Sequence, residues 1–327
     1  MSTFRMMKNK CGLCGHVFES RTLTSTNAFG SPDLDLRPPQ MKRATIPMWI
    51  DKCPNCGYVH AEIEKNGKQH KAFIKSKDYI MCEGAKLSSG LARDFYKFAL
   101  ILLRENDRLA AYDAFLHAAW ASDDSGDVKG AVFCRNKAIS LYDEKLFKKN
   151  LNLALRHIDL LRRAGRFTDA MNFCKSIVFE DELMQKVAKF QVELSSIKDT
   201  GCYRVEDCES VFMKLYDEPF ELVKSGKKKI EVRCNDEKRK TLKVGDKIIF
   251  CRYSNPSEKI YAEITDLQSF DTFKELYTSY PMDLFGQEDK SVEEMLSAVD
   301  KIYSKEHQTK YGALAITIST RPRSIFG

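Results

Sequence analysis

Three patterns of apolar and polar positions follow one another along the chain of 327 residues. Residues 1–86 are rich in turn-forming residues and show no regular apolar repeat. Residues 87–200 carry apolar side chains at helical spacing, and residues 208–320 combine short strand-forming runs with two helical stretches. The polar sequence SSIKDTGCYRVEDC, at 195–208, predicts a linker between the last two parts. We therefore predict a multidomain α+β protein with three domains that have these boundaries.

The middle domain is expected to consist of helical hairpins. Its clearest apolar stripes run over residues 151–161 and 167–177, and Gly165 between them favours a turn. A weaker form of this pattern, GDVKGAVFC, begins about 39 residues earlier, at residue 126. The hairpins resemble tetratricopeptide (TPR) repeats, whose period is about 34 residues. Such helices can present a groove to a protein partner or serve only as a spacer.

Composition narrows the class of protein. The sequence is 43% hydrophobic and 30% charged, which is typical of a globular chain and excludes a fully disordered or collagen-like one. It contains no run of 18 apolar residues, so we expect no membrane-spanning helix and no membrane partner. Its first residues lack the apolar segment of a secretion signal, and we therefore expect a cytoplasmic protein with reduced or metal-bound cysteines.

The basic residues are unevenly distributed along the chain. The formal net charge is +7, yet residues 201–327 hold 21 Lys and Arg against 22 Asp and Glu. Within that part, residues 224–247 hold ten basic and four acidic side chains, a local charge of +6. A basic stretch in a near-neutral module indicates either a surface that faces an anion or a solvated lysine-rich loop.

Four of the eleven cysteines form two CxxC pairs, each followed by glycine. Such a turn directs two thiolates at one ion, and two turns complete a closed tetrahedral site for structural zinc. The 38 residues between the pairs exceed the usual ribbon spacing of about 15–20. A redox-active CxxC is less well supported, because no βαβ pattern surrounds either pair. The predicted zinc ligands are Cys11, Cys14, Cys53 and Cys56.

The segment between the two pairs contains the sequence DLRP at residues 35–38. Together with both CxxCG turns and the following helices, it resembles a bacterial family of unknown function. Members of that family place a DLRP stretch between two CPxCG-like turns and continue into TPR-like helices. The resemblance covers residues 8–180. It implies a zinc-ribbon-like region followed by TPR-like helices, and it implies no activity.

The last domain contains the pattern GxKxxExR at Gly226, Lys228, Glu231 and Arg233, followed by the turn and strand KVGDKIIF. The later sequences KIYAEITDLQSF, SVEEMLSAVDKIYS and KYGALAITI come in the same order as in an ASCH domain, which the whole module resembles. The resemblance covers residues 213–320. It implies a small β-barrel related to the PUA domains that bind RNA, so we expect RNA or a nucleoside as a partner.

The charged residues of this motif suit an anionic or carbonyl-bearing ligand. Arg233 can donate two parallel hydrogen bonds to a phosphate or a base edge, and Glu231 can accept one from an exocyclic amine. Strand alternation places Glu231 and Arg233 on one face and favours Lys229 beside them, whereas the family pattern favours Lys228. We follow the family and expect Lys228, Glu231 and Arg233 in the cleft, although such charges can also form an inert salt-bridge set.

The same resemblance raises an enzymatic alternative. Some ASCH proteins hydrolyse N4-acetylcytidine, and others are described as ribonucleases. The amidohydrolases use a lysine, a threonine two residues before the motif arginine, and a later glutamate. Lys228 matches the lysine and Glu288 the later glutamate, but Glu231 occupies the threonine position, so the nucleophile is absent. A hydrolase would use Lys228 as base and Glu231 or Glu288 as acid.

Three functions follow from these observations. The first is binding of RNA or a modified nucleoside in the ASCH cleft, with the zinc region and the helices contacting a partner or a longer nucleic acid. The second is a ribonuclease or a small amidohydrolase. The third is a protein adaptor that uses the helical groove and carries the ASCH domain as a passive module. We favour the first, because the basic segment 224–247 coincides with the family motif.

Overall fold

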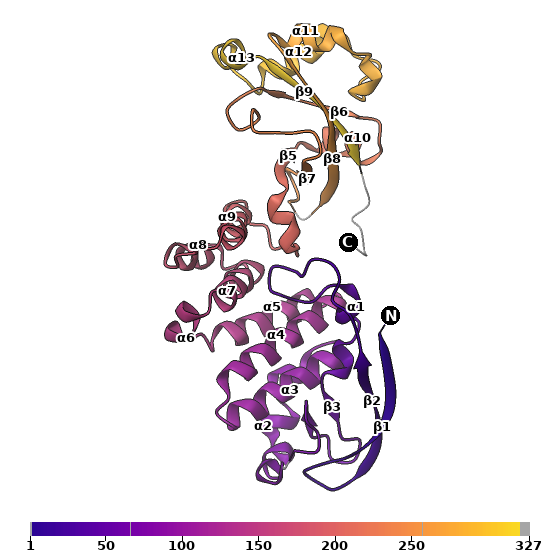
Figure 1. Ribbon diagram of the computed structural model, residues 1–327, viewed down its shortest axis with the longest axis vertical. Helices are drawn as coiled ribbons and strands as arrows, with labels where there is room; N and C mark the ends of the chain where they lie inside the picture. Colours follow the sequence, from indigo (N-terminus) through magenta and orange to yellow (C-terminus); the bar gives the residue numbers. More distant parts are fainter. Residues whose placement is uncertain (1, 66, 257, 321–327) are drawn as a thin grey trace. The chain divides into compact units, whose positions relative to one another are not determined.

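The computed structural model describes residues 2–65, 67–256 and 258–320 of the chain (Figure 1). These residues divide into two compact units, an N-terminal unit that ends at residue 208 and a C-terminal unit that begins at residue 209. Both units combine helices with strands, so the predicted α+β class is confirmed. Among the described residues, no helix has both the length and the apolar character needed to span a bilayer.

Two small hairpins, each built around one CxxC turn, belong to the N-terminal unit. Strand β1 (Thr3–Lys10) pairs antiparallel with β2 (Val17–Ser25), and β3 (Asp51–Lys52) pairs antiparallel with β4 (Val59–His60). Each CxxC sequence lies in the turn that connects the two strands of its hairpin. The other segments of this part form short helices, which are α1 (Gln40–Arg43), η1 (Ile46–Met48), η2 (Lys68–His70), η3 (Phe73–Lys75), α2 (Lys77–Ile80) and η4 (Glu83–Lys86).

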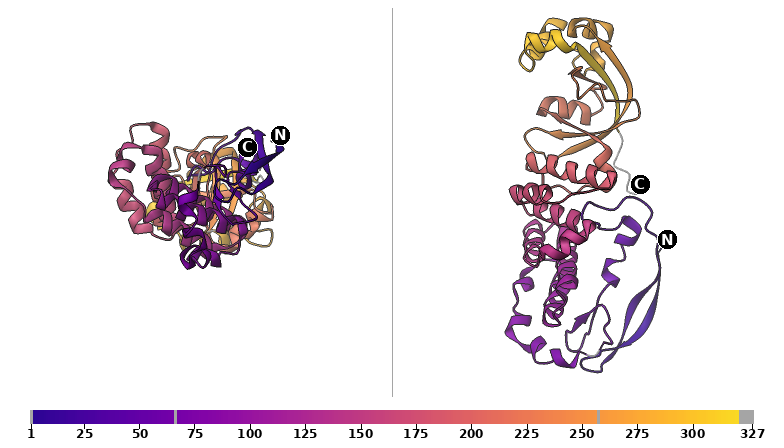
Figure 2. Two further views of the ribbon diagram at one scale, coloured as in Figure 1. Left: turned by 90° about the horizontal axis from the view of Figure 1, so that it is seen from below. Right: turned by 60° about the vertical axis from the view of Figure 1, so that its left-hand side comes forward.

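A series of longer helices packs beside these hairpins (Figures 1 and 2). The side chain of Ser89 caps the first of them and that of Asn150 caps a later one, by accepting a hydrogen bond from a backbone N–H of the first turn. The predicted turn at Gly165 is confirmed, and its φ of +78° is one that glycine adopts without strain. The helices are α3 (Gly90–Arg104), α4 (Arg108–Asp124), α5 (Val128–Ile139), α6 (Glu144–Lys149), α7 (Leu151–Arg163), α8 (Phe167–Lys175) and α9 (Glu182–Ser196).

The two charged side chains of the DLRP segment, Asp35 and Arg37, are buried in the N-terminal unit, and Asp35 contacts helices α4 and α7. Asp35 is fully buried, and it accepts hydrogen bonds from Nε1 of Trp120 at 2.7 Å and from Nη1 of Arg163 at 3.2 Å. Nη2 of Arg163 also donates to Asp123 at 2.8 Å. The segment therefore ties the loop between the two hairpins to the helices through buried charges.

The histidine His157 of α7 lies in an aromatic cluster of the same unit. Its side chain is buried, and its ring contacts those of Tyr142, Phe147 and Phe173. Burial lowers the pKa of His157 to about 4, and the nearby cation Arg166 acts in the same direction. The folded protein therefore holds this histidine neutral at pH values where an exposed histidine is protonated.

We expect this histidine to weaken the N-terminal unit in acid. The unfolded chain protonates His157 below a pKa of about 6.5, whereas the folded chain does so only near 4. The free energy of unfolding should therefore fall by about 3 kcal/mol from this residue alone as the pH decreases from about 7 to 4. Urea unfolding across this range should show a smaller loss of stability for His157→Phe than for the wild type. Parallel pH curves for the two proteins would contradict this assignment.

The C-terminal unit is built around one five-stranded sheet with the order β5-β7-β8-β9-β6. Strands β5 and β7 run parallel, and the other neighbouring strands run antiparallel. Helix α10 packs against one part of the sheet, and α11 and α12 form a second core with β6 and β9. The short helix η5 (Val205–Glu209) lies at the boundary of the two units. The elements of the C-terminal unit are β5 (Val211–Leu215), α10 (Asp217–Lys224), β6 (Ile230–Cys234), β7 (Lys247–Arg252), β8 (Lys259–Phe270), α11 (Phe273–Ser279), η6 (Met282–Leu284), α12 (Val292–Asp300), α13 (Lys305–Tyr311) and β9 (Ala313–Thr320).

The sheet is curled but open, so the predicted barrel is corrected to a half-barrel (Figures 1 and 2). Strands β5 and β6 stand at the two ends of the strand order and do not pair with each other. The side chain of Arg233 on β6 connects the two edges instead, because its Nη2 donates to the carbonyl oxygen of Lys214 on β5 at 2.7 Å. If β5 and β6 were hydrogen-bonded to each other along their length, the space between these two edge strands would be closed.

Candidate metal centre and nucleic-acid pocket

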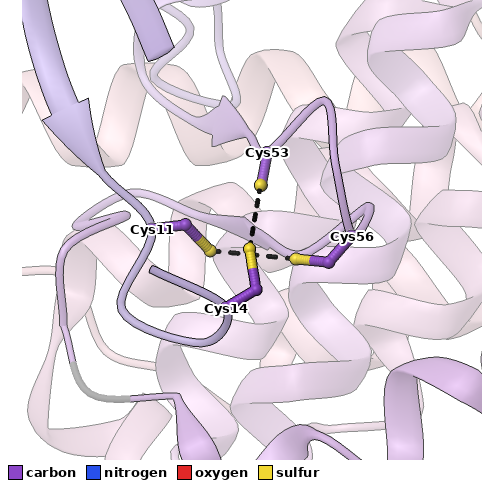
Figure 3. A group of neighbouring side chains, drawn as sticks. All are labelled: Cys11, Cys14, Cys53 and Cys56. Atoms are coloured by element: carbon purple, nitrogen blue, oxygen red, sulfur yellow. Dashed lines mark hydrogen bonds between the residues drawn. The ribbon is translucent and has the colours of Figure 1, made fainter. Parts of the chain in front are cut away.

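The two CxxC turns have the same backbone geometry. The N–H of Gly15 donates to the carbonyl oxygen of Cys11 at 2.8 Å, and the N–H of Gly57 donates to that of Cys53 at 2.9 Å. The two glycines have φ values of +76° and +73°, in the left-handed region that favours glycine. The sequence CxxCG thus forms the same tight turn twice, and the side chains of the two turns point toward one another (Figure 3).

The four sulfur atoms of Cys11, Cys14, Cys53 and Cys56 lie within 4.8 Å of one another. Sγ of Cys11 is 3.8 Å from that of Cys56, and Sγ of Cys14 is 3.6 Å from that of Cys53. These separations exclude disulfides, whose sulfur atoms are about 2.05 Å apart. They fit a tetrahedral thiolate site, because ligands about 2.3 Å from a zinc ion lie about 3.8 Å from one another. The four cysteines selected from the sequence therefore form one cluster that can hold a metal ion.

The thiols of this cluster differ in their acidity. Burial would raise the pKa of Cys14, but hydrogen bonds from the backbone of His16 and from the side chain of Asn55 outweigh it and lower the pKa to about 6. Burial raises the pKa values of Cys53 and Cys56. Thiolates this close together repel one another unless a cation lies between them. Metal binding would therefore release protons from the cluster.

A pocket of about 280 Å³ in the C-terminal unit is lined by residues of both edge strands, β5 and β6. Lys228, Glu231 and Arg233 all line it, so the structure brings these three residues together. Glu288 is exposed and is not one of the lining residues. The aromatic and apolar part of the lining includes Tyr216, Tyr253, Phe273, Tyr277, Ile302 and Tyr303.

Glu231 is the centre of a row of three charges on the pocket wall. Its Oε2 lies 2.8 Å from Nζ of Lys228, and its Oε1 lies 2.7 Å from Nε of Arg233. Burial alone would raise the pKa of Glu231, but the two cations outweigh it and hold the pKa below its ordinary value. The carboxyl group is therefore ionised at neutral pH. The three charges are paired with one another, yet they border the cavity and leave a net positive charge on its wall.

The chain path explains why Lys228, rather than Lys229, lines the pocket. Helix α10 ends just before Gly226, whose φ of +75° turns the chain. Strand β6 begins only at Ile230, so Lys228 lies outside the strand and does not follow its alternation. An isolated bridge to Phe285 holds Lys228 in place beside the strand.

The aromatic side of the pocket is not identified by sequence reasoning. Tyr277 on α11 and Tyr303 after α12 come from segments far from the GxKxxExR motif. Tyr303 interacts with Arg233 and, together with Glu231, raises the pKa of that guanidinium against the effect of burial. The one available signal was the family-like sequence SVEEMLSAVDKIYS, which contains Tyr303.

Known proteins resemble the C-terminal unit. The ASCH domain family matches residues 213–321, which confirms the predicted C-terminal domain and its PUA-like fold. A crystal structure of the hypothetical protein PH0355 is 34% identical, covers 34% of this chain and 99% of its own, and has a TM-score of 0.32. A solution structure of protein PF0455 from Pyrococcus furiosus is 32% identical, covers 35% of this chain and 99% of its own, and has a TM-score of 0.30. No curated protein matches the chain.

Proposed function

Residues 213–321 form an ASCH domain, and from this premise we propose that the protein binds RNA or a modified nucleoside in the pocket between β5 and β6. ASCH domains are generally associated with RNA. The observation that carries the proposal is the meeting of Lys228, Glu231 and Arg233 at one cavity that also has aromatic walls. Cationic groups attract phosphates, and aromatic rings favour the flat faces of bases.

The size and charge of the pocket suit a single nucleoside or nucleotide. Its volume of about 280 Å³ is just below the range of small-molecule sites, which are roughly 300–1,000 Å³. Lys228 has three donor hydrogens and forms an ion pair with Glu231, so its ammonium group can also bind a phosphate. Arg233 is anchored by Glu231 and by the carbonyl oxygen of Lys214, which fixes the shape of this wall. The ionised Glu231 can accept a hydrogen bond from an exocyclic amine.

Replacing Lys228 by alanine should weaken RNA binding by about tenfold to a hundredfold, because a hydrogen bond to a charged group contributes about 1.5–3 kcal/mol. Lys229→Ala is the matched control, since it removes the same charge one residue away and outside the pocket lining. Fluorescence anisotropy with a labelled ten-nucleotide RNA at several salt concentrations measures both affinity and salt dependence. Lys228→Ala should also reduce the slope of log Kd against log salt by about one. Equal effects of the two variants would indicate general electrostatic attraction and contradict binding in the pocket.

Two observations weigh against the hydrolase alternative. A general acid at neutral pH needs a raised pKa, whereas Lys228 and Arg233 overcome the effect of burial and lower the pKa of Glu231. Glu288, the other candidate acid, does not line the pocket. Incubation of the protein with RNA and with N4-acetylcytidine separates the two functions. Turnover that disappears in Lys228→Ala would establish an enzyme, and retention of the ligand without turnover would establish a binding protein.

For the N-terminal unit we propose a structural zinc ion, held by Cys11, Cys14, Cys53 and Cys56. Four thiolates around one tetrahedral ion leave no open coordination position, so the ion would stabilise the fold and would not catalyse. We also propose that the helices α3–α9 form TPR-like pairs that contact a protein partner or a longer RNA. The support for this second proposal is the series of packed helical hairpins and the resemblance to the bacterial zinc-knuckle family.

A further inference from the structure

Two exposed tyrosines and an exposed isoleucine lie at the pocket of the ASCH domain. Tyr216 is 59% exposed, Tyr253 is 60% exposed and Ile302 is 55% exposed, and all three line the pocket. In the described part of the C-terminal unit, Val244 is the only other large apolar side chain that is so exposed. Single exposed apolar residues are common on protein surfaces, but here most of them gather at one place. Exposed aromatic rings beside cationic side chains favour a ligand with flat faces and negative charge.

The parallel pairing of β5 and β7 places the two tyrosines next to each other. Leu215 faces Arg252 at the end of this pair, so Tyr216 and Tyr253 leave the adjacent carboxyl ends of two parallel strands. The N–H of Tyr253 donates to the carbonyl oxygen of Leu215 at 2.8 Å, which continues the ladder by one bond. The ring centroids are 5.2 Å apart, and the ring planes are tilted by 42°. The backbone thus places the two tyrosines side by side at the pocket.

A lysine lies beside one of the two rings, and further cations line the adjacent pocket. Nζ of Lys214 lies 5.8 Å from the centroid of the Tyr253 ring, and Lys214 itself lines the pocket. Lys214, Lys228 and Arg233 outnumber the single lining carboxylate, that of Glu231. A single RNA strand offers phosphates at regular intervals with aromatic faces between them. The arrangement of rings and cations therefore matches a strand better than an isolated nucleoside.

We propose that Tyr216 and Tyr253 form a stacking platform for the base next to the one that enters the pocket. This inference rests on the proposed function and narrows the ligand to single-stranded RNA of at least two nucleotides. A free nucleoside would fill the pocket but has no second base to lie on the two rings at its edge. The bases of a duplex are already stacked and paired, so they cannot lie on the tyrosine rings without the cost of unpairing.

The test compares two probes on the full chain, cytidine 5′-monophosphate and a ten-nucleotide single-stranded RNA of mixed sequence. Tyr216→Ala and Tyr253→Ala should each bind the RNA roughly 5- to 150-fold more weakly, and should lose less affinity for the mononucleotide, which has no second base to stack on the rings. Tyr253→Phe is the matched control, because it keeps the ring, and its RNA affinity should match the wild type. The same RNA annealed to its complement should bind more weakly than the single strand.

Several results would overturn the platform. Unchanged RNA affinity in both alanine variants would rule out the platform. The pocket proposal would still stand, provided that Lys228→Ala weakens RNA binding. An equal loss of affinity for the RNA and for the mononucleotide would also rule out the platform, because the tyrosines would then contact only the base in the pocket. Wild-type protein that binds neither probe overturns the proposed function together with the platform. Both tyrosines are exposed, so the variants should retain the melting temperature of the wild type, which controls for folding.

Discussion

Replacing Cys53 by serine should unfold the cysteine-rich part of the N-terminal unit, and strong chelation of the wild-type protein should have the same effect. Structural zinc contributes about 10–16 kcal/mol of binding free energy at neutral pH, comparable with the entire stability of a domain, about 5–15 kcal/mol. Cys11 and Cys53 are buried in one core with Tyr58, Ile63 and Ile101. Because the metal would hold the two hairpins of this core together, its loss should release both of them.

Metal analysis and near-ultraviolet circular dichroism measure this effect. Protein purified without added metal should contain about one zinc per chain, whereas Cys53→Ser should contain little and should lose the part of the aromatic signal that comes from the cysteine-rich region. Cys174→Ser is the matched control, because Cys174 is a partly exposed thiol outside the cluster. That variant should keep both its zinc and its spectrum. Metal-free wild-type protein with an intact spectrum would refute the zinc proposal.

The features that the sequence predicts well depend on a few neighbouring residues. The CxxCG turns fold alike because the glycine after each pair adopts a positive φ, and this depends on no distant contact. Glu231 and Arg233 line one pocket because they are two positions apart on a strand. The position of Lys228 is harder to predict, since it depends on where the strand begins.

The rest of the pocket depends on contacts between distant segments. Neither Tyr216 nor Tyr253 stands out in its own stretch of sequence, and only the parallel pairing of β5 with β7 places them side by side. The barrel prediction fails for a similar reason. The same strand sequences suit a closed or an open sheet, and the observed gap depends on how two edge strands meet, where Arg233 bonds to the backbone of Lys214.

The segment between the helices and the ASCH domain shows the same limit. Its polar composition predicts a linker, yet Asp199 and Tyr203 are buried. Nη1 of Arg162 on α7 donates to the carbonyl oxygens of Asp199 and Gly201 at 2.8 and 2.9 Å, and so binds the segment to the helices. A pattern of apolar residues cannot reveal a segment that is buried through hydrogen bonds to a distant arginine.

The other large effect is expected at the DLRP segment. Asp35→Ala should lower the free energy of unfolding of the N-terminal unit by about 3–5 kcal/mol, because it leaves a buried arginine without one of its partners. The variant removes the acceptor of both Arg163 and Trp120, and these side chains are themselves buried. Burial alone would raise the pKa of Asp35, but Arg163 and Arg135 outweigh it and lower the pKa. The stabilisation is therefore present at neutral pH and is lost as the pH falls through the lowered pKa.

Urea unfolding of matched variants separates the buried charge from an ordinary surface ion pair. Asp169→Ala breaks the exposed pair with Arg166, whose atoms are 2.7 Å apart, and should cost only about 0–1 kcal/mol. Asp35→Asn should give an intermediate loss, since its amide oxygen can still accept from Trp120 but no longer neutralises Arg163. Nη2 of Arg163 also donates a hydrogen bond to Asp123 at 2.8 Å. If Asp35→Ala costs no more than the surface variant, Asp123 alone must balance the charge of Arg163. The DLRP segment would then fix the conformation of the loop between the two hairpins, and Asp35 would not be needed to balance the charge of Arg163.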